Sequence, residues 1–387
     1  MSDLIQIGAA LDRVNWNFPS SGTNMHGVHG IHAFPGNSIP QIPSAFIQIL
    51  SQPGAVVFDP FGGSGTTAIE ALKLGREAIC SDLLSTSVLA INGKVSAYRS
   101  ANISVEANDI LRELTWDHAC ETDDVGANHE GGDPELSSWY HPRTLRQLKF
   151  IWFLIEKTSK EIRPVLELLF SDVLFSCAST MRSKTSSGLV RRHHWGWVAD
   201  NVKPQNPSEN NAIENFRRRL IQIANLVVEH PQESVKVAIL RQDAKALALR
   251  DSSVDLIVTS PPYVGVIDYA RASRLLYMWR NWDLDLERGQ ETGARYKRGR
   301  KSLQSDYLAE MRGCWQEISR VLKPGGYCAI VIGESRRYPN TVKITLDDMS
   351  SLMTPVWGPR EREPSRRRVS DRSASDAVEY LMVWRKQ

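Results

Sequence analysis

One stretch of this chain combines residue types that could bind a planar group through hydrogen bonds and ring stacking. It is Thr259-Ser260-Pro261-Pro262-Tyr263, and the apolar, β-branched run 254–258 precedes it. Such a run is typical of a strand buried on both faces of a parallel sheet. Because proline cannot donate to a sheet ladder, the strand must end at the two prolines. The sequence therefore places Ser260 and Tyr263 at the carboxyl edge of a sheet, where open α/β folds bind ligands.

The chemistry available in this stretch is that of hydrogen-bond acceptors beside an aromatic ring. Two consecutive prolines fix φ, so the carbonyls of Ser260 and Pro261 are held rigidly next to Tyr263. Carbonyl and hydroxyl oxygens accept the protons of an exocyclic amine, and the ring can stack on a planar base. A proline pair alone is most often an ordinary turn, so this interpretation depends on a second motif.

The second motif is a glycine-rich loop between a predicted strand, 55–58, and a predicted helix, 68–74. Glycines let the backbone approach a ligand closely, and the helix N-terminus offers unpaired N–H groups with positive potential. In this context the loop predicts the binding of a nucleotide-like cofactor. Its residues are Asp59, Pro60, Phe61, Gly62, Gly63, Ser64, Gly65, Thr66 and Thr67.

A carboxylate ends the next predicted strand, 78–82. Asp82 lies about 20 residues beyond the glycines, where Rossmann-like folds bind ribose hydroxyls. It can equally cap the helix predicted at 86–98, and the two roles are compatible.

Two further runs, 103–106 and 235–240, compete for one place in the predicted sheet. Each is followed by an acid, so Asp109 and Asp243 are rival candidates for a contact with an adenine amine. Later runs at 327–332 and 377–384 complete a mixed sheet with an antiparallel edge.

Length and composition limit the class of protein to which this chain can belong. The chain has 387 residues, of which 42% are hydrophobic, enough for one large domain or two modest ones. A formal charge of +3 does not by itself indicate a polyanionic partner. The five cysteines lack paired spacing, which argues against a disulfide framework and a zinc site. With no apolar run of about 18 residues and no signal peptide, we expect a cytoplasmic protein without membrane contact.

The middle of the chain differs from its two flanks. Residues 117–138 are acidic and glycine-rich, whereas 140–179 are apolar with helical spacing. We therefore expect an inserted helical region at 112–234, between a cofactor-binding half at 1–111 and a catalytic half at 235–387.

Basic residues gather in loops, where they suit phosphate contacts, and an interleaved tryptophan suits base stacking. A solvated basic turn is the alternative explanation. The candidate nucleic-acid contacts are Arg182, Lys184, Arg191, Arg192, Trp195, Arg271, Arg295, Lys297, Arg298, Arg300 and Lys301.

With both motifs in one α/β chain, the sequence resembles the amino-group class of S-adenosylmethionine-dependent DNA methyltransferases. Residues 59–67 are similar to the family's cofactor motif and 259–263 to its catalytic motif, while 320–326 resemble a stretch shared widely among methyltransferases. His32-Ala33-Phe34-Pro35 resembles the N-terminal motif that completes the methionine pocket. Here the sequence departs from the pattern, since Gly36-Asn37 stands where a small residue and a lysine are usual.

The resemblance implies a Rossmann-like α/β fold with a mostly parallel seven-stranded sheet and an inserted target-recognition region. It implies S-adenosylmethionine as cofactor, double-stranded DNA as substrate and no metal, and it allows a cognate restriction endonuclease as partner. His32, Phe34 and Thr259 would join the cofactor site, and Ser260, Pro261, Pro262 and Tyr263 would be catalytic.

The target base is the least determined part of this prediction. A serine at the position of Ser260 goes mainly with N4-cytosine methylation in this family. An extruded cytosine would place its amine among Ser260, the Pro261 carbonyl and Tyr263, and no cysteine nucleophile is needed. N6-adenine methylation, RNA guanine N2-methylation and a non-catalytic nucleic-acid-binding module remain alternatives.

Overall fold

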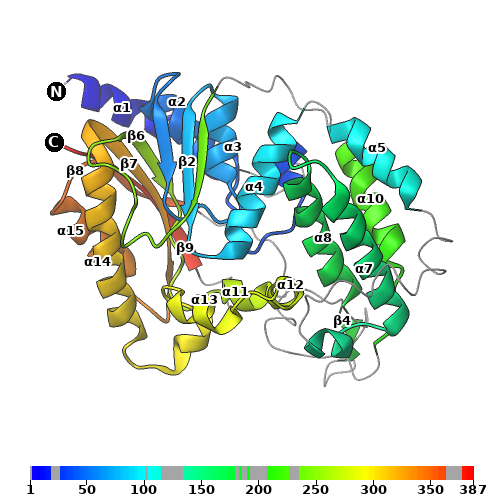
Figure 1. Ribbon diagram of the computed structural model, residues 1–387. Helices are drawn as coiled ribbons and strands as arrows, with labels where there is room; N and C mark the ends of the chain where they lie inside the picture. The colour runs from blue at the N-terminus through cyan, green and yellow to red at the C-terminus, as the bar shows by residue number, and fades with distance from the viewer. Residues whose placement is uncertain are drawn as a thin grey trace.

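A seven-stranded sheet forms the centre of the computed structural model (Figure 1). The structure describes residues 2–18, 27–100, 103–114, 134–178, 183–184, 190–191, 207–225, 235–362 and 377–387. The sheet order is β5-β2-β1-β6-β7-β9-β8. The strands are β1 (Val56–Asp59), β2 (Glu77–Asp82), β5 (Val237–Arg241), β6 (Val254–Thr259), β7 (Leu322–Ser335), β8 (Thr354–Arg362) and β9 (Ala377–Arg385).

The sheet is parallel from β5 to β7, and only β9 runs in the opposite direction. This confirms the predicted mixed sheet with an antiparallel edge. Because β1 and β6 are adjacent and parallel, the loops that follow them emerge side by side. The two motifs of the sequence are therefore neighbours in space.

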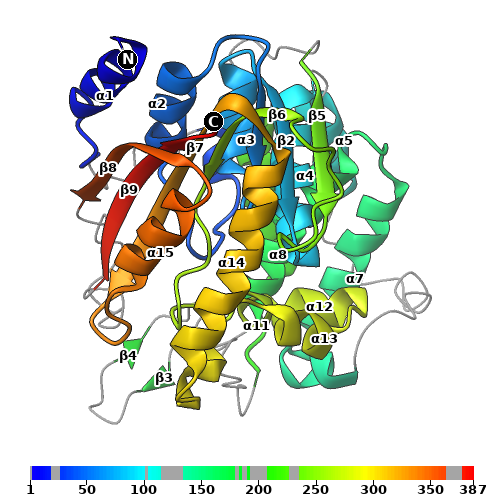
Figure 2. The ribbon, with the colours of Figure 1, turned by 90° about the vertical axis from the view of Figure 1, so that its left-hand side faces the viewer.

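Side-chain alternation along the central strands divides the core into two layers. Ala329 and Val331 of β7 pack in the cluster that contains the first helices, whereas Cys328, Ile330 and Ile332 pack in the other. The first layer is formed by α2 (Gln41–Leu50), α3 (Thr66–Lys73) and α4 (Ser85–Arg99). The second is formed by α14 (Leu303–Val321) and α15 (Thr341–Ser350), as Figure 2 shows.

Further helices lie beside α4, away from the antiparallel edge of the sheet (Figure 1). They share the first core layer rather than forming a core of their own. They are α5 (Ile103–Glu113), α7 (Pro142–Lys157), α8 (Arg163–Cys177) and α10 (Ala212–Ala224). The 3-10 helix η3 (Pro134–Ser138) and the two-residue strands β3 (Ser183–Lys184) and β4 (Val190–Arg191) complete the described part of this region.

The prediction of a strand at 103–106 was wrong, because these residues begin helix α5. Ile103, Ala107 and Ile110 are its buried residues, and their spacing of four and three places them on one helical face. The competition for one place in the sheet is thereby resolved. β5 pairs with β2, and α5 packs against α10.

The short helices after β6 lie below the sheet in both views (Figures 1 and 2). They are α11 (Tyr269–Ala272), α12 (Arg274–Arg280) and α13 (Leu284–Gln290), followed by the 3-10 helix η4 (Arg295–Gly299). Among the described residues, no helix combines the length and apolar character needed to cross a bilayer.

Candidate active site

A cavity of about 1010 Å³ opens at the carboxyl ends of the parallel strands. Both sequence motifs line it, together with residues that follow β2 and β5. A hydrogen bond of 2.6 Å from the Thr259 hydroxyl to Asp59 joins the end of β6 to the end of β1. The structure thus brings the glycine loop and the Ser-Pro-Pro-Tyr stretch to one site.

The glycine loop is shaped by close contacts with β2. The amide of Gly62 donates to the carbonyl of Ser81 at 2.8 Å, and a Cβ at this position would lie 2.4 Å from the Cys80 sulfur. Only glycine fits there without a shift. Gly63, with φ of +49°, donates to Asp82 at 2.9 Å. The loop therefore presents backbone to the cavity directly before helix α3.

Asp59 holds the base of this loop rather than facing solvent. It accepts hydrogen bonds from the Thr259 hydroxyl and, at 3.1 Å, from the amide of Phe61. Burial raises the pKa of its carboxyl to about 6. The carboxylate thus fixes the geometry of both loops.

Asp82 bridges the glycine loop and the start of α4. Its two oxygens accept from the amides of Gly63 and Leu84, and burial raises its pKa. Asp82 lines the cavity, so the predicted contact with ribose hydroxyls is geometrically open. The predicted capping role is corrected, because the N-cap of α4 is Leu84, and Asp82 binds the amide of that residue rather than occupying the cap position.

The structure separates the two rival acids. Asp243 lines the cavity, whereas Asp109 lies on α5, with 56% of its side chain exposed, and forms an ion pair with Arg112. Asp109 is not a cavity residue because the segment that carries it is a helix and not a strand ending at the site. Its assignment to the cofactor site is therefore corrected.

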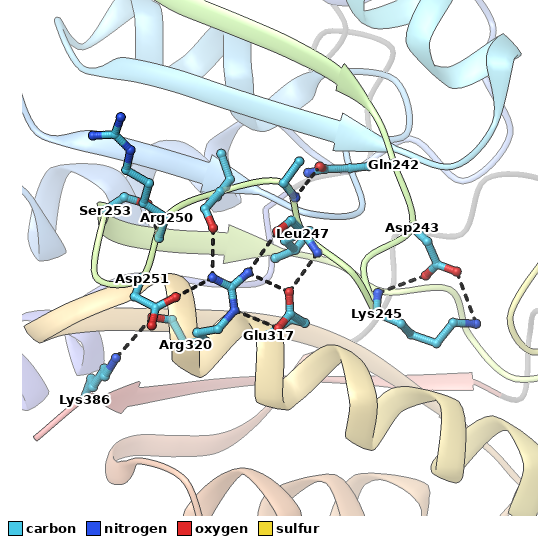
Figure 3. Close-up of polar contacts among 12 residues, drawn as sticks. Gln242, Asp243, Lys245, Leu247, Arg250, Asp251, Ser253, Glu317, Arg320 and Lys386 are labelled. Atoms are coloured by element: carbon cyan, nitrogen blue, oxygen red, sulfur yellow. Dashed lines mark hydrogen bonds and ion pairs between the residues drawn. The ribbon is translucent and has the colours of Figure 1, made fainter.

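The segment that carries Asp243 is anchored to helix α14 by one arginine (Figure 3). Arg320 donates to the carbonyls of Leu247 and Leu249 at 2.9 and 2.8 Å and to Asp251 at 2.6 Å. Glu317 pairs with Arg320 at 2.7 Å and accepts from the amide of Leu247. Arg320 begins the stretch that resembles a shared methyltransferase motif, and here it fixes the β5–β6 connection.

Most of the other predicted cofactor residues also line the cavity. They are His32, Phe34, Pro60, Phe61, Gly62, Gly63, Ser64, Thr66, Thr67 and Thr259. Gly65 does not line it. Instead, Gly65 has φ of +79° and lies against Ile91, so it shapes the entry to α3.

The inserted helices form one wall of the cavity, which sequence reasoning missed. Ser171 and Asp172 of α8 and Arg219 of α10 line it. The His32 ring contacts Ser171 at 2.8 Å and Asp172 at 3.5 Å, and Asp172 is paired with Arg219. Burial lowers the pKa of His32, which favours its neutral form. The only sequence signal for this wall was a set of polar residues within an apolar helix.

The Ser-Pro-Pro-Tyr stretch lies beside the glycine loop, and all four residues line the cavity. The Tyr263 hydroxyl donates to Glu379 of β9 at 3.1 Å. A Cβ on Gly333 would lie 2.4 Å from the Tyr263 ring, so the ring rests directly on the β7 backbone. Burial, followed by the charge of Glu379, raises the pKa of Tyr263 well above its ordinary value, so its hydroxyl stays protonated.

Glu379 and Arg362 are further cavity residues that the sequence analysis did not name. The Arg362 guanidinium forms an ion pair with Glu379 and donates to the carbonyl of Trp16 at 3.2 Å. A signal for Glu379 was available, because it is the one charged residue in the otherwise apolar run 377–384.

The loop beyond Tyr263 is braced by a buried acid. Glu291 accepts from the amides of Tyr269 and Ala270 at 2.9 and 3.0 Å, which caps α11. Burial raises the pKa of Glu291 to about 7. This acid lines the cavity together with Arg295.

The predicted nucleic-acid contacts fall into two groups. Arg271 lines a smaller cavity of about 350 Å³ beside α12, and Arg295 lines the main cavity. Lys297 donates to the carbonyl of Glu291 in its own loop, whereas Arg298 donates to the carbonyl of Gly265 in the loop after β6. Arg300 and Lys301 are exposed. Of the other group, Arg182, Arg192 and Trp195 lie outside the described residues, and Lys184 and Arg191 are described in backbone only, in β3 and β4. Within the described ranges, no cluster of His, Cys, Asp and Glu has the arrangement of a metal site.

Comparison with known families decides what kind of protein this is. A family model described as DNA methylase matches residues 15–92 and 254–387, more than half of the chain. The chain belongs to the DNA methylase family. A second model, described as RMKL-like methyltransferase domain, matches residues 177–281 of the methylase.

Individual relatives of this methylase are distant. Type II methyltransferase M.MjaII of Methanocaldococcus jannaschii is 21% identical over 80% of the chain and 72% of its own length. Type II methyltransferase M.MvaI of Kocuria varians is 24% identical over 67% of the chain, which spans 59% of that relative. Among solved structures, the rRNA methyltransferase aviRa of Streptomyces viridochromogenes aligns over 97% of this chain and 94% of its own, with 13% identity and a TM-score of 0.38.

S-adenosylmethionine is the cofactor of this methylase. The cavity fits such a molecule, since it combines carboxylates at Asp82 and Asp243, which can accept from hydroxyls and an amine, with the apolar rings of Phe34 and Phe61. Gly63 adds a backbone segment that no Cβ covers.

Proposed function

We propose that this methylase transfers the methyl group of S-adenosylmethionine to the exocyclic N4 amine of cytosine in duplex DNA. The observation that carries this proposal is the meeting of Ser260, Pro261 and Tyr263 with the glycine loop in one cavity. A role in restriction and modification, with a cognate endonuclease as partner, fits the Type II relatives.

The cofactor supplies an electrophilic methyl group when it is bound. We assign its binding to the cavity residues of the glycine loop, to Asp82 and Asp243, and to His32 and Phe34 of the N-terminal motif. In this assignment the carboxylates accept from the hydroxyl and amine groups, and the two rings cover apolar surface.

On the target side, the Ser260 hydroxyl and the Pro261 carbonyl accept hydrogen bonds from the two N–H groups of the target amine. This would draw the nitrogen toward tetrahedral geometry and direct its lone pair to the transferable methyl group. As the new N–C bond formed, the bond from the methyl carbon to the sulfonium sulfur would break, and the surplus amine proton would pass to water. Tyr263 stacks on the base, and its hydroxyl is already engaged by Glu379, which fixes the plane of the ring. Serine at position 260 favours cytosine over adenine.

DNA would approach along the loop 288–301 and the inserted region 112–234. Arg295 lies at the cavity, and the exposed Arg300 and Lys301 have no ion-pair partner among the described residues. Such cations suit phosphate contacts, which position a duplex without reading its sequence. The target base must leave the stack to reach a cavity of this kind.

The test is to incubate the protein with labelled S-adenosylmethionine and unmethylated DNA and to identify the methylated nucleoside by mass spectrometry. We expect N4-methylcytosine. N6-methyladenine would keep the site and overturn the base assignment, and label in an RNA control alone would overturn the DNA substrate. Sequencing the methylated DNA then gives the recognition site.

A variant pair connects this activity to the site. Ser260→Ala should lower turnover by about 10²-fold, the cost of one preorganised transition-state contact. Ser305→Ala, which changes an exposed serine on α14, is the matched control and should leave turnover unchanged. Cofactor affinity measured by calorimetry should be equal in the two variants.

A further inference from the structure

Three residues form a row across the antiparallel edge of the sheet, beside the catalytic motif. Gly333 of β7 is paired with Glu379 of β9, and Glu379 is paired in turn with Arg362 of β8. The ring of Tyr263 lies on the first member of this row and its hydroxyl on the second. The row therefore extends the site from the parallel strands onto the edge strands.

Arg362 is the member of the row with unused hydrogen-bonding capacity. Arg362 is only 3% exposed, yet its side chain lines the cavity. Nη1 pairs with Glu379 and Nε donates to Trp16, but Nη2 is buried and has no partner in the described structure. Since a guanidinium has donors only and a buried donor without an acceptor is costly, this nitrogen calls for an acceptor on a ligand.

We propose that Arg362 binds the target base. Its Nη2 donates to the ring nitrogen next to the amine, while Glu379 is a positioning residue that holds Arg362 and Tyr263 together. The inference rests on the proposed function, because it requires a base in the cavity. Cytosine and adenine both offer such an acceptor, N3 and N1 respectively, so the role of Arg362 does not depend on which base is methylated.

The chemistry favours the base rather than the cofactor as the ligand of Arg362. Its partner Glu379 holds the hydroxyl of Tyr263, the residue that stacks on the base. The carboxylates assigned to the cofactor, Asp82 and Asp243, follow β2 and β5 on the other side of β1. The site is thus divided by β1 and β6 into a cofactor half and a base half.

The experiment compares a normal duplex with one whose target base is replaced by its deaza analogue, which has a C–H at the ring position in question. The analogue is 3-deazacytosine or 1-deazaadenine, according to the base identified by mass spectrometry. We expect the wild type to lose about 10- to 100-fold in kcat/KM on the analogue, the value of a hydrogen bond from a charged donor.

Two variants separate recognition from folding. Glu379→Gln keeps an acceptor for Arg362 and Tyr263, so it should still discriminate against the analogue. The double variant Arg362→Met with Glu379→Gln removes the ion pair as a unit, which leaves no buried unpaired charge. The double variant should have the same kcat/KM on both duplexes, and this value should equal that of the wild type on the analogue duplex.

The outcomes that overturn the proposal are specific. If the double variant discriminates as strongly as the wild type, Arg362 does not contact this atom. If its kcat/KM falls by the same factor on both duplexes, or if the wild type does not discriminate, the role of Arg362 is structural only. A wild type that methylates no DNA would refute the proposed function itself, and this is seen before any variant is made. Unchanged cofactor affinity in calorimetry shows that each variant is folded.

Discussion

The glycine loop and the Ser-Pro-Pro-Tyr stretch lie at the ends of adjacent strands, but they are held in different ways. The glycines of the first loop are held by residues close in sequence, as in the hydrogen bond from Gly63 to Asp82, 19 residues away, although Asp59 at the start of the loop accepts from the distant Thr259. The Ser-Pro-Pro-Tyr stretch is fixed by residues far along the chain, as in the bond from Tyr263 to Glu379, 116 residues away. With the roles proposed above, cofactor binding by the glycines therefore depends mainly on local structure, whereas the position of the Tyr263 ring depends on β7 and β9.

The largest effect should come from Asp59, where the two loops meet. Burial raises the pKa of its carboxyl from 3.8 to about 6, so the folded state binds the proton more tightly than the unfolded state. This contribution to stability is complete below pH 3.8 and is lost as pH rises through 6. We expect wild type to lose about 2–3 kcal/mol relative to Asp59→Asn between pH 4 and 7. Urea unfolding of both proteins across this pH range measures the difference in their free energies of unfolding. If the two free energies changed in parallel with pH, the prediction would be contradicted.

A methyl group on Gly333 should act on the catalytic side only. Its Cβ would lie 2.4 Å from the Tyr263 ring, so Gly333→Ala must displace the ring. We expect kcat to fall by about 10²-fold, as for a misplacement of about 1 Å, with cofactor affinity unchanged. Gly289→Ala in α13 is the control, since a Cβ there meets no atom within 4 Å. Weaker cofactor binding in Gly333→Ala would show that the two loops are not independent.

The hydrogen bond between the two loops should contribute less. Thr259→Val removes the donor to Asp59 while preserving the shape of the side chain. We expect a loss of about 1–2 kcal/mol in the free energy of unfolding, since a buried acceptor loses one partner. Cofactor affinity and kcat should fall together, because the bond spans both loops. A change in only one of them would place Thr259 with one loop alone.

The smallest predicted effect is on cofactor affinity in a variant of Asp109, where we expect no change. Asp109→Asn changes an exposed, ion-paired side chain on α5 and should leave cofactor affinity as it is. Asp243→Asn, made in a residue that lines the cavity, should weaken cofactor binding by about tenfold through the loss of one charged acceptor. Calorimetry on the two variants compares the acids directly. A weaker affinity in Asp109→Asn would contradict the assignment drawn from the fold.

The same contrast explains what could be predicted from the sequence. The glycine loop, β1, β2 and the strand before Ser260 were predicted correctly, because turn residues and apolar runs act locally. The run 103–106 was misread, since a short apolar segment fits a strand or the first turn of a helix. Glu379, Arg362 and the wall formed by Asp172 and Arg219 could not be found by spacing, because strand order and helix packing bring them to the site.

The position of β6 between β1 and β7 has a consequence during synthesis on the ribosome. The amide of Val56 in β1 bonds to Asp255 of β6, 199 residues later in the chain. At about 5–20 residues per second, roughly 10–40 s separate the emergence of these two strands. During that interval β1 can pair with β2 but has an unpaired edge on its other side. The nascent chain can thus form β1, the glycine turn and β2 well before the rest of its sheet, and the edges of β1 and β2 stay unpaired until β6 and β5 emerge.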